Sequence, residues 1–325
     1  MSLNTPSPKK NPGEPPSTFR KLDGIDLGKQ HLSRCDTLQR IYEAAKENQY
    51  VVLGSPPATG KTSLLQLLQK SLSEKGANVI RFPIRSEADA LVKNLAENGI
   101  TANEEVMQKL KNTWLLIDDA QNAYDLAYNK FWEIIVKDGS AFCAKGLFVV
   151  IAATYDLNTA PSPVSFGSMT HVDPNLSLTE AEALVEMHLD HWNFAKWHVY
   201  GEQILGISKL YGAATYNVGV IMACIRLLGD TKARHKSISE DEAVALLRGV
   251  DFITYLNRCY EMEVGSRVTE EMKKYLAIAL LSRPGVEDFS LSVIRPLLRA
   301  GILNTNGKFS CLAANWYYNR KCFPN

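Results

Sequence analysis

The stretch that decides the fold of this 325-residue chain is Ser55-Pro56-Pro57-Ala58-Thr59-Gly60-Lys61-Thr62. An apolar run that ends at Gly54 precedes it, and a leucine-rich segment that begins at Ser63 follows it. A loop of this kind between a strand and a helix is typical of phosphate binding, because backbone N–H groups and the positive end of the helix face the same anion. The pattern therefore predicts that the residues from Gly54 to Ser63 lie against a bound phosphate.

Two residues of this loop have specific expected roles. The Lys61 ammonium is expected to reach the β- and γ-phosphates and to act in catalysis, and the Thr62 hydroxyl is expected to ligate Mg²⁺. The loop departs from the usual pattern at Ser55 and Ala58, where glycine is common. Because serine and alanine avoid the positive φ angles that glycine adopts freely, we expect a loop that is tighter, or shifted by one residue onto Gly54.

A second motif is Thr113-Trp114-Leu115-Leu116-Ile117-Asp118-Asp119-Ala120-Gln121. An apolar run that ends in two acids indicates a buried Walker B strand, which delivers carboxylates to the carboxyl edge of a sheet. Asp118 is expected to hold Mg²⁺ through water, and Asp119 to orient the attacking water. Asp119 is one methylene shorter than the glutamate common at this position, so the sequence predicts slow hydrolysis. A chance Gly-Lys-Thr and a solvated acidic turn are the alternatives, and the presence of both motifs disfavours them.

Composition and charge narrow the class of protein. The net charge is +1, so the overall charge of the chain does not favour binding to a nucleic acid. Six cysteines occur without a C-x-x-C pair, which favours reduced thiols in the cytoplasm or nucleus. The N-terminus lacks the apolar core of a signal peptide, so we expect an intracellular protein. The longest apolar run, 147–153, is too short to span a bilayer, and no membrane partner is expected.

The chain is predicted to contain four parts. A disordered, proline-rich tail covers residues 1–19, and a P-loop NTPase domain covers 20–175. A helical lid is expected over 176–265 and a winged-helix-like domain over 266–325. This organisation is typical of a multi-domain protein with one nucleotide-binding core.

Strands are predicted to alternate with helices in the first half of the chain. A helix capped by Ser33 or Asp36 is expected to run to Asn48, and one from Ser63 to Lys75. Thr154 follows a predicted strand and is a candidate sensor of the γ-phosphate, with a plain strand-ending threonine as the alternative. The fold class is therefore α/β, a parallel sheet with helices on both faces, with predicted strands at 50–54, 78–84, 146–153 and 169–172 in addition to the Walker B strand within 113–121.

The second half of the chain is predicted to be largely helical. Capping boxes at Thr179-Glu182 and Ser239-Glu242 open helices that run to about His191 and Tyr260. Helices at 269–282 and 291–300, followed by a hairpin around Asn306-Gly307, give the order of a winged-helix module. No acid follows Asp288, so this end is a candidate for DNA or an acidic protein partner through Arg295, Arg299, Lys308, Arg320 and Lys321.

Together these motifs resemble the AAA+/STAND branch of P-loop ATPases. The resemblance rests on Leu53–Thr62, Leu115–Gln121, Ile151–Asp156 and Leu176–Ala181. More narrowly, the aromatic end at Ser310–Tyr318, joined to a lid of this length, is similar to the NTPase module of crinkler-type effectors of filamentous eukaryotes. The chain lacks the translocation header and the nuclease cluster of that group.

The resemblance carries expectations about ligands and location. It implies binding and hydrolysis of ATP with Mg²⁺, self-association and action in a host nucleus. It also implies that Arg34 contacts the base or ribose, with a surface arginine as the alternative. Asn129-Lys130-Phe131-Trp132 lacks the aspartate that pairs with guanine, so adenine is favoured. Three arginines remain candidates for the finger that contacts the phosphates, namely Arg85, Arg226 and Arg234.

Two classes of function are consistent with these residues. One is an ATPase whose turnover drives conformational work, and the other is a nucleotide-controlled switch that hydrolyses ATP slowly. Asp119 and the substituted loop favour the switch, of which a crinkler-type effector is one form. The alternative is a DNA-binding ATPase of the origin-recognition type that uses the C-terminal module. Nucleotide-kinase chemistry is disfavoured, because the sequence offers no short arginine-rich lid after the sheet.

Overall fold

A computed structural model describes the chain at residues 24–84, 112–123, 132, 146–154, 169–191, 197–211, 216–235, 238–249, 252, 254–256, 269–280, 289–303, 308–309, 314–315 and 318. Several predicted features lie outside these residues: the tail at 1–19, the helix from Ser86, the helix at 131–136 apart from Trp132, and the turn at Asn306-Gly307.

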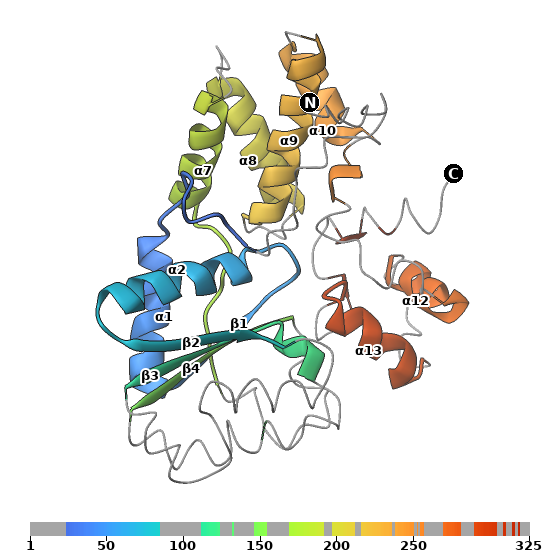
Figure 1. Cartoon of the computed structure of the whole chain (residues 1–325). Coiled ribbons are helices and arrows are strands. Elements are labelled where there is room, and N and C mark those ends of the chain that lie inside the picture. Colours follow the sequence, from blue (N-terminus) through green and yellow to red (C-terminus); the bar gives the residue numbers. More distant parts are fainter. Residues whose placement is uncertain are drawn as a thin grey trace, which may run out of the picture.

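A five-stranded parallel sheet forms the centre of the first half (Figure 1). Its order is β2-β3-β4-β1-β5, so β4 lies between the two strands that carry the predicted motifs. Every residue of β3 and β4 is buried, which explains their near-continuous apolar sequences. The predicted α/β class is confirmed, with strands β1 (Tyr50–Gly54), β2 (Asn78–Pro83), β3 (Thr113–Asp118), β4 (Leu147–Ala153) and β5 (Thr170–His171).

Two helices cover one face of this sheet. They are α1 (Cys35–Asn48) and α2 (Lys61–Glu74). Ile41 of α1 and Leu65 of α2 are fully buried against residues that alternate along the strands. The intervening strand residues, such as Leu115 and Ile151, are equally buried, so both faces of the sheet are covered.

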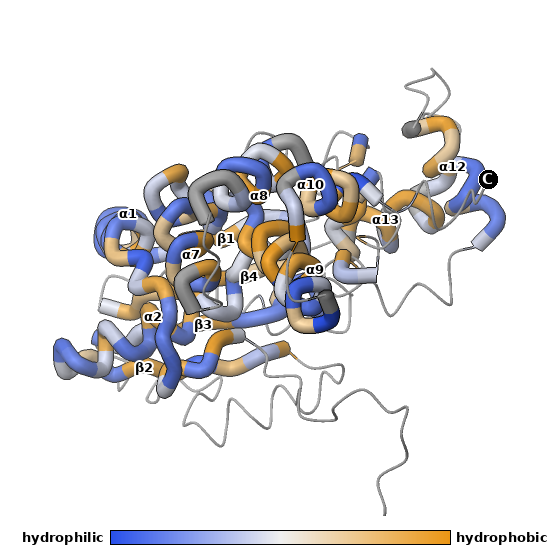
Figure 2. Tube along the Cα trace, turned by 90° about the horizontal axis from the view of Figure 1, so that it is seen from above, coloured by the Kyte–Doolittle hydropathy of each residue, from blue (hydrophilic) through white to orange (hydrophobic). Residues whose placement is uncertain are grey.

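The second half is helical, as predicted, and its described helices share one apolar core. A continuous cluster of buried residues extends from Leu176 to Tyr318. Figure 2 shows α9 changing from apolar at its start to polar at its end, so its first half supplies much of this core. The helices are α7 (Leu178–His191), α8 (Trp197–Tyr211), α9 (Val218–His235), α10 (Glu240–Arg248), α12 (Glu270–Leu280) and α13 (Leu291–Arg299). An antiparallel bridge between Leu303 and Phe309 follows, where the hairpin was predicted.

Some helix boundaries differ from the predictions. Neither Ser33 nor Asp36 caps α1, because Arg34 occupies the cap position with φ 53° and makes no side-chain cap bond. The box at Ser239 is confirmed, but its helix ends at Arg248, before Gly249, a residue of low helix propensity.

The predicted box at Thr179 is also wrong. Ser177 and Glu180 form the reciprocal bonds, with the Glu180 N–H donating to Ser177 Oγ and the Ser177 N–H donating to the Glu180 carboxylate. The helix therefore begins two residues earlier than predicted, at Leu178. Among the described helices, none is long and apolar enough to cross a membrane.

A buried ion pair joins the start of α1 to the start of α7. Arg34 Nε lies 3.2 Å from Glu180 Oε1, and the guanidinium also donates to the carbonyl oxygens of Pro174 and Asn175 and to Thr37 Oγ1. Burial lowers the pKa of Arg34, and Glu180 opposes that change. Burial raises the pKa of Glu180, but the bonds from Ser177 and Arg34 outweigh burial and hold that pKa below its usual value. The pair therefore joins the start of α1, which packs on the sheet, to the start of α7.

We predict that Glu180→Ala lowers the free energy of unfolding by about 3–5 kcal/mol, because it leaves the Arg34 charge buried without its partner. Glu182→Ala is the matched control, since Glu182 is exposed on the same helix and its loss should change stability by less than about 0.5 kcal/mol. Urea denaturation of both variants checks this. Equal stabilities would show that the pair does not hold the two domains together.

Candidate functional site

The two sequence motifs meet at one edge of the sheet. Ser55 follows the carboxyl end of β1, and Asp118 is the last residue of β3. Because all strands run parallel, these ends lie at the same edge. The Thr62 hydroxyl donates to Asp118 Oδ1 at 3.2 Å, although the two residues are 56 positions apart. The structure thus brings together the loop lysine, the threonine and the acidic strand end.

Lys61 folds back over its own loop. Its Nζ donates to the carbonyl oxygens of Pro56 at 2.7 Å and of Ser55 at 2.9 Å. Burial lowers the pKa of Lys61 to about 8, and the charges of Asp118 and Asp119 oppose that change. The contacts to carbonyl oxygens favour the charged form, so the ammonium is retained at neutral pH.

The substituted loop residues replace glycine flexibility with side-chain contacts. Ser55 Oγ and Thr59 Oγ1 hydrogen bond to each other, and Thr59 Oγ1 also contacts the Pro56 carbonyl at 3.1 Å. Both hydroxyl-bearing residues are buried. A serine at the first position therefore holds the inside of the loop together, a role that pattern comparison with glycine did not reveal.

Ala58 has the backbone geometry that glycine would favour. Its φ is 59°, and Gly60, which precedes α2, has φ 87°. Gly54 is the last residue of β1, paired with Ala153, so the loop begins at Ser55. The predicted start of the helix at Ser63 was two residues late, because Lys61 is already its first residue.

The acidic pair has two different environments. Asp118 is 4 % exposed and accepts a bond from the Asp119 N–H. Burial, and then the charge of Asp119, raise the pKa of Asp118 to about 6. Asp119 is exposed, has φ 53°, and accepts a bond from Gln121 Nε2 at 3.3 Å. Asp118 thus lies buried inside the site, and Asp119 lies at its exposed side.

Arg81 is a site residue that sequence reasoning missed. Its guanidinium NH1 lies 3.9 Å from Asp118 Oδ2, and its side chain is 27 % exposed. The available signal was a charged residue in the middle of the apolar β2 segment. The contact places positive charge beside the most buried acid of the site.

Thr154 directly follows β4, between the ends of β1 and β3, and is buried. This location is compatible with a sensor of phosphate, which stays a prediction. Arg34 is engaged with Glu180, so its proposed contact with base or ribose also stays a prediction. Arg226 and Arg234 lie on α9, and Arg85 lies outside the described residues. The structure therefore does not show which of these three arginines would contact the phosphates.

The loop also contacts the helical half of the chain. The Gly219 N–H at the start of α9 donates to the Ala58 carbonyl at 2.8 Å. A Cβ added at Gly301, in the turn after α13, would lie 2.6 Å from Pro57 Cδ. The start of α9 and the turn after α13 therefore both lie against the loop. A change in the conformation of the loop would alter its contacts with these two segments.

The donor atoms at this edge suit a hard cation. The Thr62 hydroxyl and the Asp118 carboxylate already lie within hydrogen-bonding distance, and Mg²⁺ binds through oxygen ligands of this kind. Burial and then the charge of Asp119 raise the pKa of Asp118, and a cation bound here would oppose both effects. Thr62 and Asp118 therefore fit a magnesium ion.

Comparison with known proteins agrees with this geometry. The chain is similar to a Walker-type ATPase of Pyrococcus abyssi, with a TM-score of 0.56, 10 % identity, and coverage of 88 % of this chain and 95 % of that one. The fold is that of a P-loop ATPase. No protein-family model and no curated protein matches the sequence.

Two weaker likenesses have TM-scores below 0.5. One is the Aeropyrum pernix ORC1 protein in complex with DNA, with a TM-score of 0.46, 12 % identity, and coverage of 90 % of this chain and 93 % of that one. The other is AMPPCP-bound DnaA from Aquifex aeolicus, with a TM-score of 0.44, 18 % identity, and coverage of 84 % and 86 %.

We predict that Ala58→Gly raises the free energy of unfolding by up to about 1 kcal/mol, because it removes the cost of an alanine at positive φ. Ala44→Gly, inside α1, is the opposite control and should lower stability by about 1 kcal/mol. Thermal unfolding of both variants checks the sign. A loss of stability in both would mean that Ala58 is not strained.

We predict that Asp118→Asn stabilises the nucleotide-free protein by about 2 kcal/mol at pH 8. The folded state binds the Asp118 proton more tightly than the unfolded state, so this acid favours folding below pH 4, and that contribution is lost as pH rises through about 6. The gain from asparagine should therefore shrink at pH 5. Denaturant titrations at both pH values test this, and a pH-independent difference would contradict it.

Proposed function

We propose that this chain binds Mg·ATP on the loop from Ser55 to Thr62 and hydrolyses it slowly, as a nucleotide-controlled switch. The observation that carries the proposal is the bond from Thr62 to Asp118, with Lys61 and Asp119 at the same sheet edge. Lysine, hydroxyl and paired carboxylates from distant segments have little reason to converge unless they bind a charged ligand together.

The hydrogen bonds that Lys61 makes within the loop are ones that a bound phosphate can replace. Lys61 donates to two loop carbonyls, and phosphate oxygens would replace these with stronger, charge-assisted bonds. The first backbone N–H groups of α2, which begins at Lys61, would supply further donors to a phosphate bound there. Mg²⁺, held by Thr62 and Asp118, would supply charge neutralisation on the phosphates.

The presence of aspartate rather than glutamate at position 119 supports slow hydrolysis of ATP. Asp119 is exposed and held by Gln121, where it can accept a proton from, or orient, a water molecule. Its short side chain reaches less far than glutamate. Asp118 would then contact the Mg²⁺ ion, and Asp119 would orient the attacking water.

Contacts with the helical half support the switch. Occupancy of the loop would alter the Ala58 carbonyl bonded to Gly219 and the Pro57 ring beside Gly301. Nucleotide state would then reach both α9 and the C-terminal module through direct contacts rather than through a long pathway.

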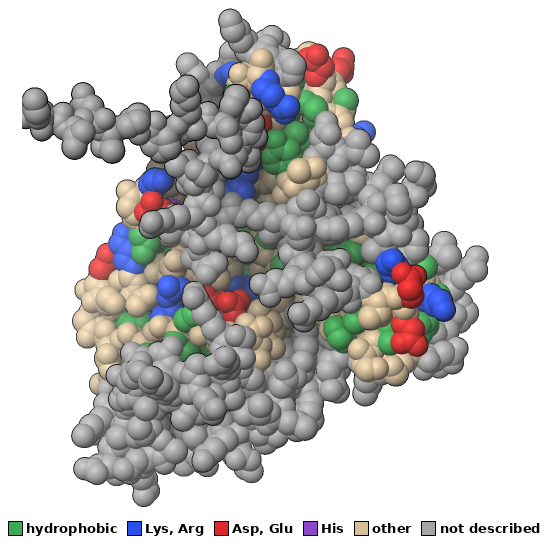
Figure 3. Space-filling model, turned by 45° about the vertical axis from the view of Figure 1, so that its right-hand side comes forward, with side chains coloured by type: hydrophobic (Ala, Val, Ile, Leu, Met, Phe, Trp, Pro, Cys, Tyr) green, Lys and Arg blue, Asp and Glu red, His purple; other side chains and the backbone are tan. Residues whose placement is uncertain are grey.

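The alternative of DNA binding rests on the basic C-terminal end. The Arg295 and Arg299 side chains lie outside the described part of the chain. On α12, exposed Glu270 pairs with Lys273, and Figure 3 shows acidic and basic side chains close together on this side of the molecule. DNA binding and self-association stay predictions. The crinkler-type role has no support from the neighbours reported above.

The test separates binding from turnover. We expect Lys61→Ala to weaken ATP binding at least about a hundredfold, because it removes charge-assisted phosphate contacts, and Asp119→Asn to bind normally but hydrolyse about a hundredfold more slowly. Calorimetry measures the first and phosphate release the second. Lys70→Ala, an exposed lysine on the same helix, is the control.

Wild-type affinity in Lys61→Ala would overturn the binding site. Wild-type turnover in Asp119→Asn would leave the binding site intact and move the base elsewhere, with Gln121 the next candidate.

A further inference from the structure

Arg81 is a charged residue on β2, the strand at one edge of the described sheet. Its register partner on β3 is Leu116. Because side chains alternate along a strand, Leu116 and Asp118 lie on one face of β3, and paired residues of neighbouring strands share a face. This face packs against α2, which carries Thr62. The register therefore places Arg81 on the same face of the sheet as the candidate metal ligands.

The two carboxylate oxygens of Asp118 have different neighbours. Oδ1 accepts a hydrogen bond from the Thr62 hydroxyl at 3.2 Å and one from the Asp119 N–H at 3.1 Å. Oδ2 lies 3.9 Å from NH1 of Arg81, which is longer than a hydrogen bond. Among the described residues, no other cation forms an ion pair with this carboxylate. The Arg81 contact is therefore electrostatic and does not occupy the lone pairs of Oδ2.

Compensation of a buried acid explains part of this contact. Burial and then the charge of Asp119 raise the pKa of Asp118, and the charge of Arg81 opposes both effects. A pair that only compensates charge is best served by short hydrogen bonds, as in the buried pair of Arg34 with Glu180 at 3.2 Å. The Arg81 side chain is instead 27 % exposed and makes a longer contact. A contact of this looser kind is one that another cation can replace.

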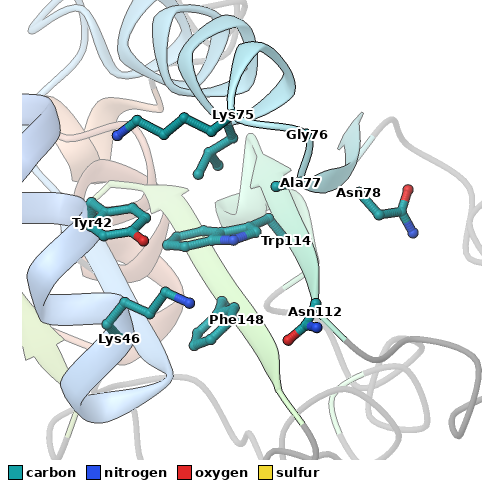
Figure 4. Close-up of a pocket in the computed structure, with 10 residues that line it drawn as sticks. Tyr42, Lys46, Lys75, Gly76, Ala77, Asn78, Asn112, Trp114 and Phe148 are labelled. Carbon is teal, nitrogen blue, oxygen red and sulfur yellow. The ribbon is translucent and has the colours of Figure 1, made fainter.

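The opposite edge of the sheet shows where cations lie when no acid is present. A hollow of about 390 Å³ lies where β2, β3 and β4 begin, and the described residues that line it include no acid (Figure 4). Lys46 Nζ lies 4.1 Å from the centroid of the Phe148 ring, and Lys75 Nζ lies 4.9 Å from that of Tyr42. Cation–π contacts and the negative ends of α1 and α2 account for both lysines. Arg81 differs, because it lies within a strand and beside a carboxylate.

A metal ion and Arg81 would compete for Asp118. Mg²⁺ held by Thr62 and Asp118 would lie close to a guanidinium that already faces the same carboxylate, and like charges at short distance repel each other. Among the described residues of this edge, Lys61 and Arg81 already balance Asp118 and Asp119. A metal ion alone would therefore add positive charge without compensation, whereas phosphates that enter with the metal would supply negative charge.

We propose that Arg81 takes the place of the metal ion at Asp118 when no nucleotide is bound, so that the site takes up a divalent cation only together with phosphate. This inference rests on the proposed function, in which Thr62 and Asp118 hold Mg²⁺. Arg81 is a positioning residue, because it acts on the metal site through Asp118. It keeps that carboxylate neutralised beside Thr62 in the empty site, and it loses this contact when Mg·ATP binds.

The test measures binding of Mn²⁺ to the full-length chain without nucleotide, at about pH 7.5, which is above the Asp118 pKa. Mn²⁺ is the probe because oxygen ligands suit it as they suit Mg²⁺, and electron paramagnetic resonance counts the free ion. The wild-type chain should bind with a Kd of about 1 mM or weaker. Arg81→Gln should bind at least about tenfold more tightly, because the competing charge is gone.

Four further variants guard the interpretation. Arg81→Met, which keeps the apolar stem of the side chain, should show the same gain and serves where the glutamine variant does not fold. Arg81→Lys keeps the charge and should stay within about threefold of wild type. Arg248→Gln removes an exposed arginine on α10 and should leave the affinity unchanged. Asp118→Asn added to Arg81→Gln should abolish the gain, which locates the metal at this carboxylate.

Thermal unfolding shows which of these chains are folded. Equal Mn²⁺ affinity in the wild-type chain and in a folded Arg81→Gln or Arg81→Met chain would overturn the proposal and leave Arg81 as compensation for a buried acid. A gain that survives Asp118→Asn would also overturn it, since the metal would then bind elsewhere. Failure of the wild-type chain to bind ATP would contradict the proposed function rather than this inference, because the Mn²⁺ comparison uses no nucleotide.

Discussion

The hydrogen bond from Thr62 to Asp118 is the contact on which the interpretation of this molecule depends. It exists because β1 and β3 run parallel on either side of β4, so both deliver their carboxyl ends to one edge. The strands are buried on both faces, which fixes their register and with it the position of the acids. A slip of one residue in β3 would turn Asp118 away from the loop and leave a buried charge unpaired.

The loop between β1 and α2 lacks two of the glycines that are common in phosphate-binding loops, at Ser55 and Ala58. Alanine adopts a positive φ at position 58, and a buried bond between Ser55 and Thr59 holds the interior. Contacts from Gly219 and from the turn at Gly301 press on the same backbone from outside. The loop, with Ala58 at a positive φ, therefore packs directly against the helical half of the chain.

The sequence predicted the elements well where an apolar run or a motif marked them. The Walker B strand predicted within 113–121 and the box at Ser239 are confirmed, because each depends on local pattern alone. The strand order, the Arg81 contact and the Arg34–Glu180 pair join residues far apart in the chain, and local periodicity holds no information about them. The capping residue of α7 is Ser177 rather than the predicted Thr179. The contact of Arg34 with Glu180 favours Glu180 as the reciprocal acid of the box.

The most direct measurement is a calorimetric titration of the wild-type chain with ATP in the presence and absence of Mg²⁺. We expect one ATP per chain, with affinity at least about tenfold tighter when Mg²⁺ is present, because Thr62 and Asp118 would then share the ion with the phosphates. Equal affinity under both conditions would contradict the metal assignment. No binding at about 1 mM ATP would contradict the nucleotide site itself.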